Sequence, residues 1–166
     1  MIHENPQPFR TVNQNCALLI RAVRPFIEEK TKEERFINDE YLFYGPATYI
    51  PRIEEEVVRE IKATVIQQNQ ALVVKAKKEL LDSEGTKRRA GERWLVRKQG
   101  SYMPHVQEEI LEVRKGYVLT DKKCIWLRAA KNMKDFYGVK RPAGSEWLVT
   151  NELANSHILD VNEKFV

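Results

Sequence analysis

The sequence predicts an all-β fold made of tandem repeats of small antiparallel β-sheet units, arranged as an elongated array. Segments of the 166-residue chain recur with a period of 53 or 54 residues, which is the sequence signature of a repeat architecture. Within each period, short runs rich in β-branched and aromatic residues alternate with turn residues, as is typical of β structure. A unit of this size is too small to bury a large core alone, so we expect neighbouring units to supply burial.

The period is clearest at one aromatic position. Tyr41, Trp94 and Trp147 are each 53 residues apart, and we expect their rings to anchor the core of each unit rather than to stack on a ligand. Other residues that recur with the period are predicted to occupy core and turn positions: Gly45, Pro46, Tyr49, Pro51, Gly91, Leu95, Gly100, Tyr102, Pro104, Gly144 and Leu148.

The period predicts three repeat units, at residues 7–60, 61–113 and 114–166. The third unit departs from the pattern, because His157 stands where the others have tyrosine and Leu159 where they have proline. Its loop after the tryptophan is also two residues longer. We expect these changes to alter the turn geometry of the third unit. Since no atypical capping unit is evident, we interpret the chain as a segment of a longer array.

The middle unit shows the elements in order. Residues 64–66 are short and β-branched, 67–70 are a polar break, and 71–77 contain Leu72, Val73 and Val74. The stretch from Asp82 to Gly85 predicts a turn, followed by strands at 87–90 and 93–97. Gly100 marks another turn, and 108–113 form the last strand.

Two stretches leave a helix open as an alternative. Residues 51–62 and 107–115 contain helix-forming residues, and a proline stands at the start of the first stretch and shortly before the second. Their β-branched residues and the surrounding β pattern favour strands instead.

Composition favours a globular protein of a reducing compartment. The net charge is +4, the pI is near 9.0 and the mean hydropathy is −0.54. No apolar run approaches the roughly 18 residues of a membrane-spanning helix, and the first residues lack the pattern of a signal peptide. Cys16 and Cys124 do not suggest a disulfide framework, and we expect both to be buried, inert thiols. These features predict a cytosolic protein.

Catalytic and cofactor motifs are not evident in the sequence. The glycines do not form a phosphate-binding loop, and His3, His105 and His157 have no partners at metal-ligand spacing. We therefore expect no enzymatic activity, no catalytic or metal-binding residues and no cofactor. A calcium site at Asp82 and Glu84 remains a weak alternative, because calcium needs several converging oxygens.

Charged clusters that recur with the period are the candidate interaction surface. The acidic members are Glu54, Glu55, Glu56, Glu108 and Glu109, and the basic members are Lys87, Arg88, Arg89, Lys140 and Arg141. Alternation of the two signs favours packing between copies. A continuous basic stripe beside exposed aromatics would instead favour a nucleic-acid-binding module, which is the alternative function.

Several of these segments resemble the repeats of the major vault protein family. The likeness rests on Glu92–Val96 (ERWLV), Glu146–Val149 (EWLV), Gly45–Pro51 (GPATYIP) and Gln68–Leu72 (QNQAL). It covers the chain from about residue 8 to residue 166, and it is most similar to three successive units of the N-terminal repeat region of the family.

The resemblance implies a structural role in the shell of the vault ribonucleoprotein particle. Such repeats would stack along the barrel wall, with identical chains side by side and no catalytic residues. The implied partners are other copies of the chain and a docked vault poly(ADP-ribose) polymerase, with vault RNA associated only indirectly and no membrane. The implied location is cytoplasmic, with a minor nuclear fraction.

Overall fold

A computed structural model describes residues 8–166, and its 21 strands confirm the all-β prediction. The described residues contain no helix, and hence none long and apolar enough to cross a membrane. Gln7, the predicted first residue of the first unit, and His3 lie outside the described residues.

The same set of seven strands occurs three times along the chain. Repeat 1 consists of β1 (Arg10–Val12), β2 (Cys16–Ala22), β3 (Phe26–Ile27), β4 (Glu34–Arg35), β5 (Glu40–Tyr44), β6 (Ala47–Tyr49) and β7 (Glu55–Lys62). Repeat 2 consists of β8 (Thr64–Ile66), β9 (Gln70–Ala76), β10 (Leu80–Leu81), β11 (Lys87–Arg88), β12 (Arg93–Val96), β13 (Gly100–Tyr102) and β14 (Glu108–Lys115). Repeat 3 consists of β15 (Tyr117–Val118), β16 (Ile125–Ala129), β17 (Met133–Lys134), β18 (Lys140–Arg141), β19 (Glu146–Val149), β20 (Ser156–His157) and β21 (Glu163–Phe165).

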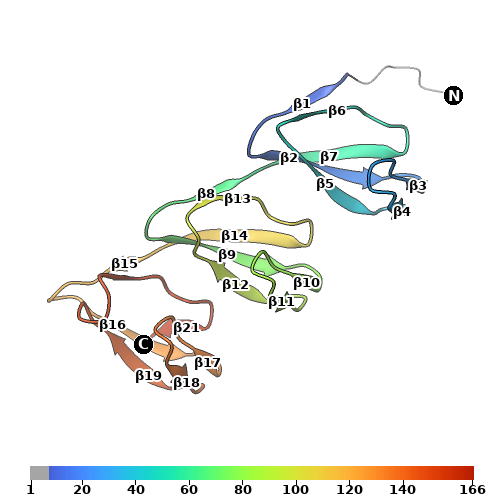
Figure 1. The fold of residues 1–166 in the computed structure, drawn as a ribbon. Coiled ribbons are helices and arrows are strands. Elements are labelled where there is room, and N and C mark those ends of the chain that lie inside the picture. Colours follow the sequence, from blue (N-terminus) through green and yellow to red (C-terminus); the bar gives the residue numbers. More distant parts are fainter. Residues whose placement is uncertain (1–7) are drawn as a thin grey trace. The chain divides into compact units, whose positions relative to one another are not determined.

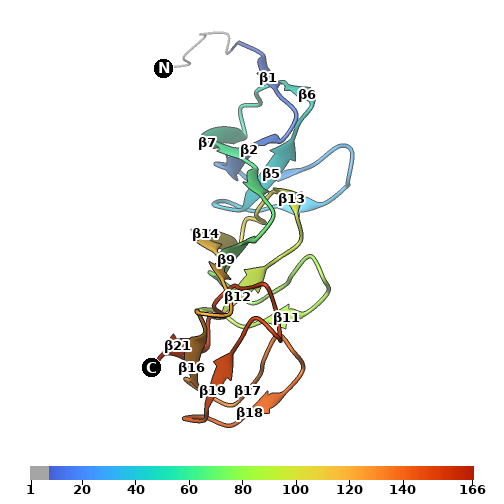
Figure 2. The same cartoon turned by 90° about the vertical axis from the view of Figure 1, so that its left-hand side faces the viewer.

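Each repeat is built on a three-stranded sheet, which can be followed in Figures 1 and 2. The strand orders are β5-β2-β7, β12-β9-β14 and β19-β16-β21. A short hairpin accompanies each sheet, formed by β3–β4, β10–β11 or β17–β18. The strands β1–β6, β8–β13 and β15–β20 make a further two-stranded pairing in each repeat. In sequence order, each hairpin follows the central strand of its sheet and precedes an edge strand.

The two stretches for which a helix was an alternative are the long edge strands β7 and β14. β7 pairs with β2 along its length: Lys62 lies opposite Cys16 at one end, and Glu55 lies opposite Ala22 at the other. β14 pairs in the same way with β9. Tertiary pairing thus decides their structure, because the central strand supplies partners along their whole length. A register shift interrupts each pairing, for example between Ile110 and Glu112.

The central strands carry the core. β2 and β9 share a pattern of four consecutive buried residues, so both of their faces are covered. β16 instead alternates between buried and exposed residues. In repeat 1 the cluster of buried residues is Val12, Leu18, Ile20 and Tyr49. In repeat 3 it is Leu119, Ile125, Leu127, Ala129, Trp147 and Val149.

The chain falls into two compact units. The first extends to Thr64 and includes Ser101–Val106, and the second consists of Val65–Gly100 and Gln107–Val166. The second unit therefore holds most of repeat 2 and all of repeat 3. The predicted limits of the three units at residues 60/61 and 113/114, which remain a prediction, fall within β7 and β14.

Turns with a left-handed backbone recur at equivalent places. The hairpin turn has such a residue at Lys32, Gly85 and Gly138, and the turn before the next sheet strand has one at Asn38, Gly91 and Gly144. Glycine adopts these conformations without the steric cost that a side chain brings. The turns therefore favour the recurring glycines of repeats 2 and 3, although Lys32 and Asn38 adopt the same backbone conformation in repeat 1.

Candidate functional site

A buried ionic contact anchors the hairpin of repeat 2 to its sheet. Arg88 Nε donates to Asp82 Oδ2 at 2.7 Å, and Arg88 Nη1 donates to Glu92 Oε1 at 3.0 Å. The guanidinium group lies 4.9 Å from the ring centroid of Trp94, which is buried. Cation–π attraction and the ion pair therefore act on the same side chain. We call this set of acid, arginine and ring the hairpin anchor.

The hairpin anchor is repeated in the other two repeats. In repeat 3, Arg141 Nε donates to Asp135 Oδ2 at 2.8 Å and lies 4.6 Å from the ring of Trp147. In repeat 1, Arg35 binds Glu28 and lies 4.5 Å from the ring of Tyr41. The tryptophans and Tyr41 are therefore joined to the charged hairpin as well as to the core.

The acid of the anchor is held in its ionised form. Burial alone would raise the pKa of Asp82, but the amides of Thr86 and Glu84 and the guanidinium of Arg88 outweigh it, so the pKa lies below its ordinary value. The same carboxylate receives backbone hydrogen bonds of 2.9 Å from Glu84 and Thr86. Its oxygens are thus committed within the hairpin, which leaves little support for calcium at Asp82 and Glu84. Among residues 8–166, no three His, Cys, Asp or Glu side chains are placed to share a metal ion.

A second recurring contact joins an aromatic or imidazole side chain to a glutamate. In repeat 1, the hydroxyl of Tyr49 donates to Glu55 at 2.7 Å. In repeat 3, His157 Nε2 lies 2.7 Å from Glu163 Oε2, and its Nδ1 lies 2.9 Å from the hydroxyl of Tyr137. His157 and Glu163 are both buried. His157, which stands where the other repeats have tyrosine, therefore keeps the contact with the glutamate. It also gains a hydrogen bond with Tyr137.

Four of the ten residues predicted for the interaction surface are placed inward instead. Arg88 and Arg141 belong to hairpin anchors, Glu55 is half-buried beside Tyr49, and Glu108 is buried. Alternate residues of a strand point to opposite faces of the sheet. A run of like charges in the sequence therefore contains both inward and outward residues, and the run alone does not show which are which. The interaction role of the remaining six stays a prediction.

Those six residues lie mostly in the open. Glu56, Lys87, Arg89, Glu109 and Lys140 are exposed, and Glu54 is half-buried. Two of them pair with the opposite charge nearby, since Glu56 lies 3.2 Å from Arg21 and Lys87 lies 2.6 Å from Glu79. The exposed faces therefore mix both signs of charge.

The predicted core and turn positions divide into two groups. Tyr49, Trp94, Tyr102, Pro104 and Trp147 are buried, while Tyr41, Gly45, Pro51 and Leu95 are half-buried. Pro46, Gly91, Gly100, Gly144 and Leu148 are exposed. For Gly91, Gly144 and Pro46 this fits turn positions, whereas Gly100, predicted as a turn, is the first residue of β13 and adopts φ of +116° there.

Leu148 does not belong to the core. It lies on the outward face of β19, directly opposite Trp126 on β16, and the two side chains are 55% and 52% exposed. Strand alternation again explains the difference, because the flanking Trp147 and Val149 point inward.

The expectation of two buried thiols was wrong. Cys124 is exposed, and Cys16 is half-buried. Partial burial and the neighbouring carboxylate of Glu60 raise the pKa of the Cys16 thiol, which lowers its reactivity.

The hairpin anchors were missed by sequence reasoning although a signal exists. In repeats 2 and 3, the acid and the arginine are six residues apart, and both recur with the 53-residue period. This spacing between acid and arginine, rather than the basic cluster alone, is the sequence signal of an anchor.

Comparisons with known proteins agree with the fold. A family model described as the major vault protein repeat domain matches residues 10–52 and 64–105. The chain is 44% identical over 165 residues to the major vault protein of Gallus gallus and 44% identical over 164 residues to that of Homo sapiens, in each case over 99% of the chain. It is 48% identical over 151 residues, or 90% of the chain, to the major vault protein alpha of Dictyostelium discoideum. The chain spans about a fifth of the length of these relatives, 18% to 19%.

Proposed function

The chain belongs to the major vault protein family, and from this premise we propose that its repeats form part of the wall of a vault particle. Many copies of the chain would stand side by side in that wall, as the resemblance of the repeats implies. The role is structural rather than catalytic, and the particle is cytoplasmic.

The recurrence of one closed unit is the observation that carries this proposal. Each repeat has its own three-stranded sheet and its own hairpin anchor. Units of this kind can be stacked in number without changing the fold of any one of them. A wall needs such regularity, because every copy must present the same contacts to its neighbour.

Charged exposed faces support contact between copies. In repeat 1, Arg21 binds both Glu40 and Glu56, at 2.8 and 3.2 Å. In repeat 3, Arg128 pairs with Glu146 on the exposed face of the sheet. Surface pairs of this kind contribute little to the stability of one chain. Complementary charges can nevertheless fix the register in which a neighbouring copy of the chain binds.

Docking of a vault-associated protein, such as the vault poly(ADP-ribose) polymerase, is a further part of the proposal. The six exposed or half-exposed charged residues named above would supply its contacts. Support comes from the resemblance and from the mixed charge of these faces.

The alternative role in nucleic-acid binding has less support. Arg88 and Arg141 are engaged by buried carboxylates, and Lys87 pairs with Glu79. Three of the five residues that would form a basic stripe are therefore paired with neighbouring acids. Such alternation of charge favours packing between copies of the chain over binding of nucleic acid.

A chimaera tests the proposal directly. The chain would replace the aligned segment of the major vault protein of Gallus gallus, and the purified product would be viewed by negative-stain electron microscopy. We expect closed particles like those of the unaltered relative. A matched chimaera with Trp94 and Trp147 replaced by Ser should fail to assemble, because it lacks two core rings.

A soluble, folded chimaera that forms no particles would overturn the proposal. Circular dichroism with a β-type spectrum would establish folding independently of assembly. Binding of the chain to a short single-stranded RNA that weakens steeply with salt would favour the alternative.

A further inference from the structure

A row of three residues crosses one end of the sheet of repeat 2. Arg114 on β14 lies opposite Ala71 on β9. On the other side of β9, Arg97 follows Val96, which lies opposite the next residue, Leu72. Ala71 is fully buried. Two arginines thus flank one small residue at the same level of the sheet.

Both arginines donate to the main chain of repeat 3. Arg114 Nη1 donates to the carbonyl oxygens of Leu159 and Asp160, at 2.8 and 3.3 Å. Arg97 Nη2 donates to that of Ile158 at 3.2 Å. Three consecutive carbonyls of the loop before β21 are therefore held by repeat 2.

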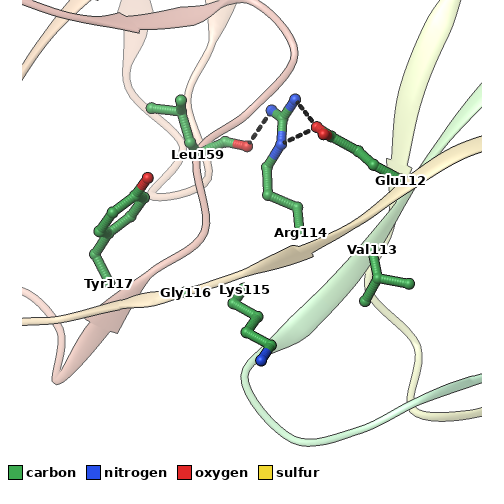
Figure 3. A pocket seen from close by; sticks show the side chains of 7 residues that line it. All are labelled: Glu112, Val113, Arg114, Lys115, Gly116, Tyr117 and Leu159. Carbon is green, nitrogen blue, oxygen red and sulfur yellow. Dashed lines mark hydrogen bonds and ion pairs between the residues drawn. The ribbon is translucent and has the colours of Figure 1, made fainter.

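Each guanidinium group is itself held in place. Figure 3 shows Arg114 between the main chain at Leu159 and the carboxylate of Glu112, which accepts from Arg114 Nε and Nη2 at 2.9 and 2.6 Å. Arg97 lies 4.5 Å from the ring centroid of Phe136, in the hairpin turn of repeat 3. The planar group can stack and donate at once, which an ammonium group cannot do in the same way.

Contacts within repeat 3 set the path of this loop. The amide of Asp160 donates to Glu163 Oε2 at 2.8 Å, and the same oxygen lies 2.7 Å from His157. His157 is in turn bonded to Tyr137. His157 and Leu159, which stand where the other repeats have tyrosine and proline, thus lie at the loop that the two arginines bind, while the longer loop of repeat 3 lies between β19 and β20.

The equivalent row of repeat 1 differs in chemistry. Tyr44 and Ile61 flank Ala17 in the same register. A tyrosine and an isoleucine cannot provide the fork of donors that an arginine does. The arginine row is therefore not a general feature of the repeat.

We infer that Arg97 and Arg114 are positioning residues, which form a clamp that fixes repeat 3 on repeat 2 by holding the loop before β21. The clamp donates to the carbonyl oxygens of this loop, and Arg97 also contacts two side chains of repeat 3, the ring of Phe136 and the carboxylate of Asp160 at 3.9 Å. The clamp would specify which repeat follows repeat 2 in the array. The role of the clamp in ordering the repeats of an array rests on the proposed function. The clamp itself can be tested in the isolated chain.

Residual dipolar couplings measured by NMR on the whole chain test the clamp. In the unaltered chain, the couplings of repeat 2 in the second unit and of repeat 3 should fit one alignment tensor. In Arg97→Gln/Arg114→Gln they should require two, while each repeat still fits its own. Amide exchange at Asp160 and Asn162 should become about tenfold faster, because local opening is easier without the clamp.

Two control variants keep the result specific. Arg93→Gln/Arg128→Gln removes the same charge from exposed sheet positions and should leave one tensor. Arg97→Lys/Arg114→Lys keeps the charge but not the fork of donors, and should restore the common tensor only in part.

The clamp is overturned if the glutamine variant keeps one tensor and unchanged exchange, or if the Arg93/Arg128 control loses the tensor equally. Full rescue by lysine would also overturn it, because charge alone would then suffice. These outcomes are separate from the wall role, since the chimaera can form particles with or without a clamp.

Discussion

At the scale of single residues, the anchor acids hold a fixed charge inside a small repeat. Asp82 receives two amide hydrogen bonds and an arginine, so its negative charge is compensated on several sides. Removal of Asp82 leaves Arg88 with the carboxylate of Glu92 as its remaining partner in the anchor. The consequences can be measured as stability and as its dependence on pH.

Asp82→Asn is expected to lower the free energy of unfolding by about 2 kcal/mol, because the half-buried Arg88 loses one of its two carboxylate partners and keeps Glu92. Urea titration followed by tryptophan fluorescence measures this. Lys87→Gln is the matched control, since it breaks an exposed pair with Glu79 and should cost under about 0.5 kcal/mol. Equal losses in the two variants would contradict the anchor.

The same acid predicts a pH dependence with a definite sign. The pKa of Asp82 is lower in the folded chain than its ordinary value of 3.8, so its contribution is present above about pH 4 and is lost as pH falls through the folded-state pKa. The urea midpoint of the unaltered chain should therefore drop more between pH 5 and pH 3 than that of Asp82→Asn. Parallel curves would show that Asp82 is not responsible.

The left-handed turn residues give a second test at this scale. Gly138 has φ of +87° and no steric obstacle to a Cβ, so Gly138→Ala should cost about 1–2 kcal/mol through the backbone alone. Lys32 occupies the equivalent turn at φ of 59°, and Lys32→Gly should be neutral or slightly stabilising. Thermal unfolding of both variants gives the comparison. A loss in Lys32→Gly equal to that in Gly138→Ala would contradict this account.

At the scale of elements, the link between Tyr49 and Glu55 joins β6 to the start of β7. Tyr49→Phe removes its donor and leaves the half-buried carboxylate with one partner fewer, so we expect a loss of about 1–2 kcal/mol. Tyr117→Phe removes an exposed hydroxyl and keeps the edge-on contact of its ring with Phe165, so it should be neutral. Chemical unfolding followed by circular dichroism distinguishes them, and an unaffected Tyr49→Phe would rule out the link.

The elements also show what the sequence could predict and what it could not. The repeat period and the turn glycines predicted the all-β fold and the positions of most strands. Propensity alone suited a helix in β7 and β14, the β-branched residues and the surrounding pattern favoured strands, and pairing with β2 and β9 confirms strands. Leu148 was assigned to the wrong face of β19. Arg97 and Arg114 could not be predicted, since their positions do not recur with the period and the carbonyl oxygens to which they donate carry no sequence pattern.

At the scale of the whole molecule, the two compact units should unfold with separate signatures. All three tryptophans, Trp94, Trp126 and Trp147, lie in the second unit. Tryptophan fluorescence therefore reports that unit alone, while circular dichroism reports both. We expect the two urea curves not to coincide, because a chain of two units need not unfold in one step. Superimposable curves would show that the units unfold together.

The pairing of strands within each repeat has a consequence for how the chain is made. In the three-stranded sheets of the described residues, paired residues lie close in sequence. The most distant pair is Cys16 and Lys62, which are 46 positions apart. Each sheet is complete once its last edge strand has left the ribosome, and later residues add nothing to it. Synthesis can therefore deliver finished repeats one after another, so that little unpaired strand is exposed to neighbouring nascent chains at any moment.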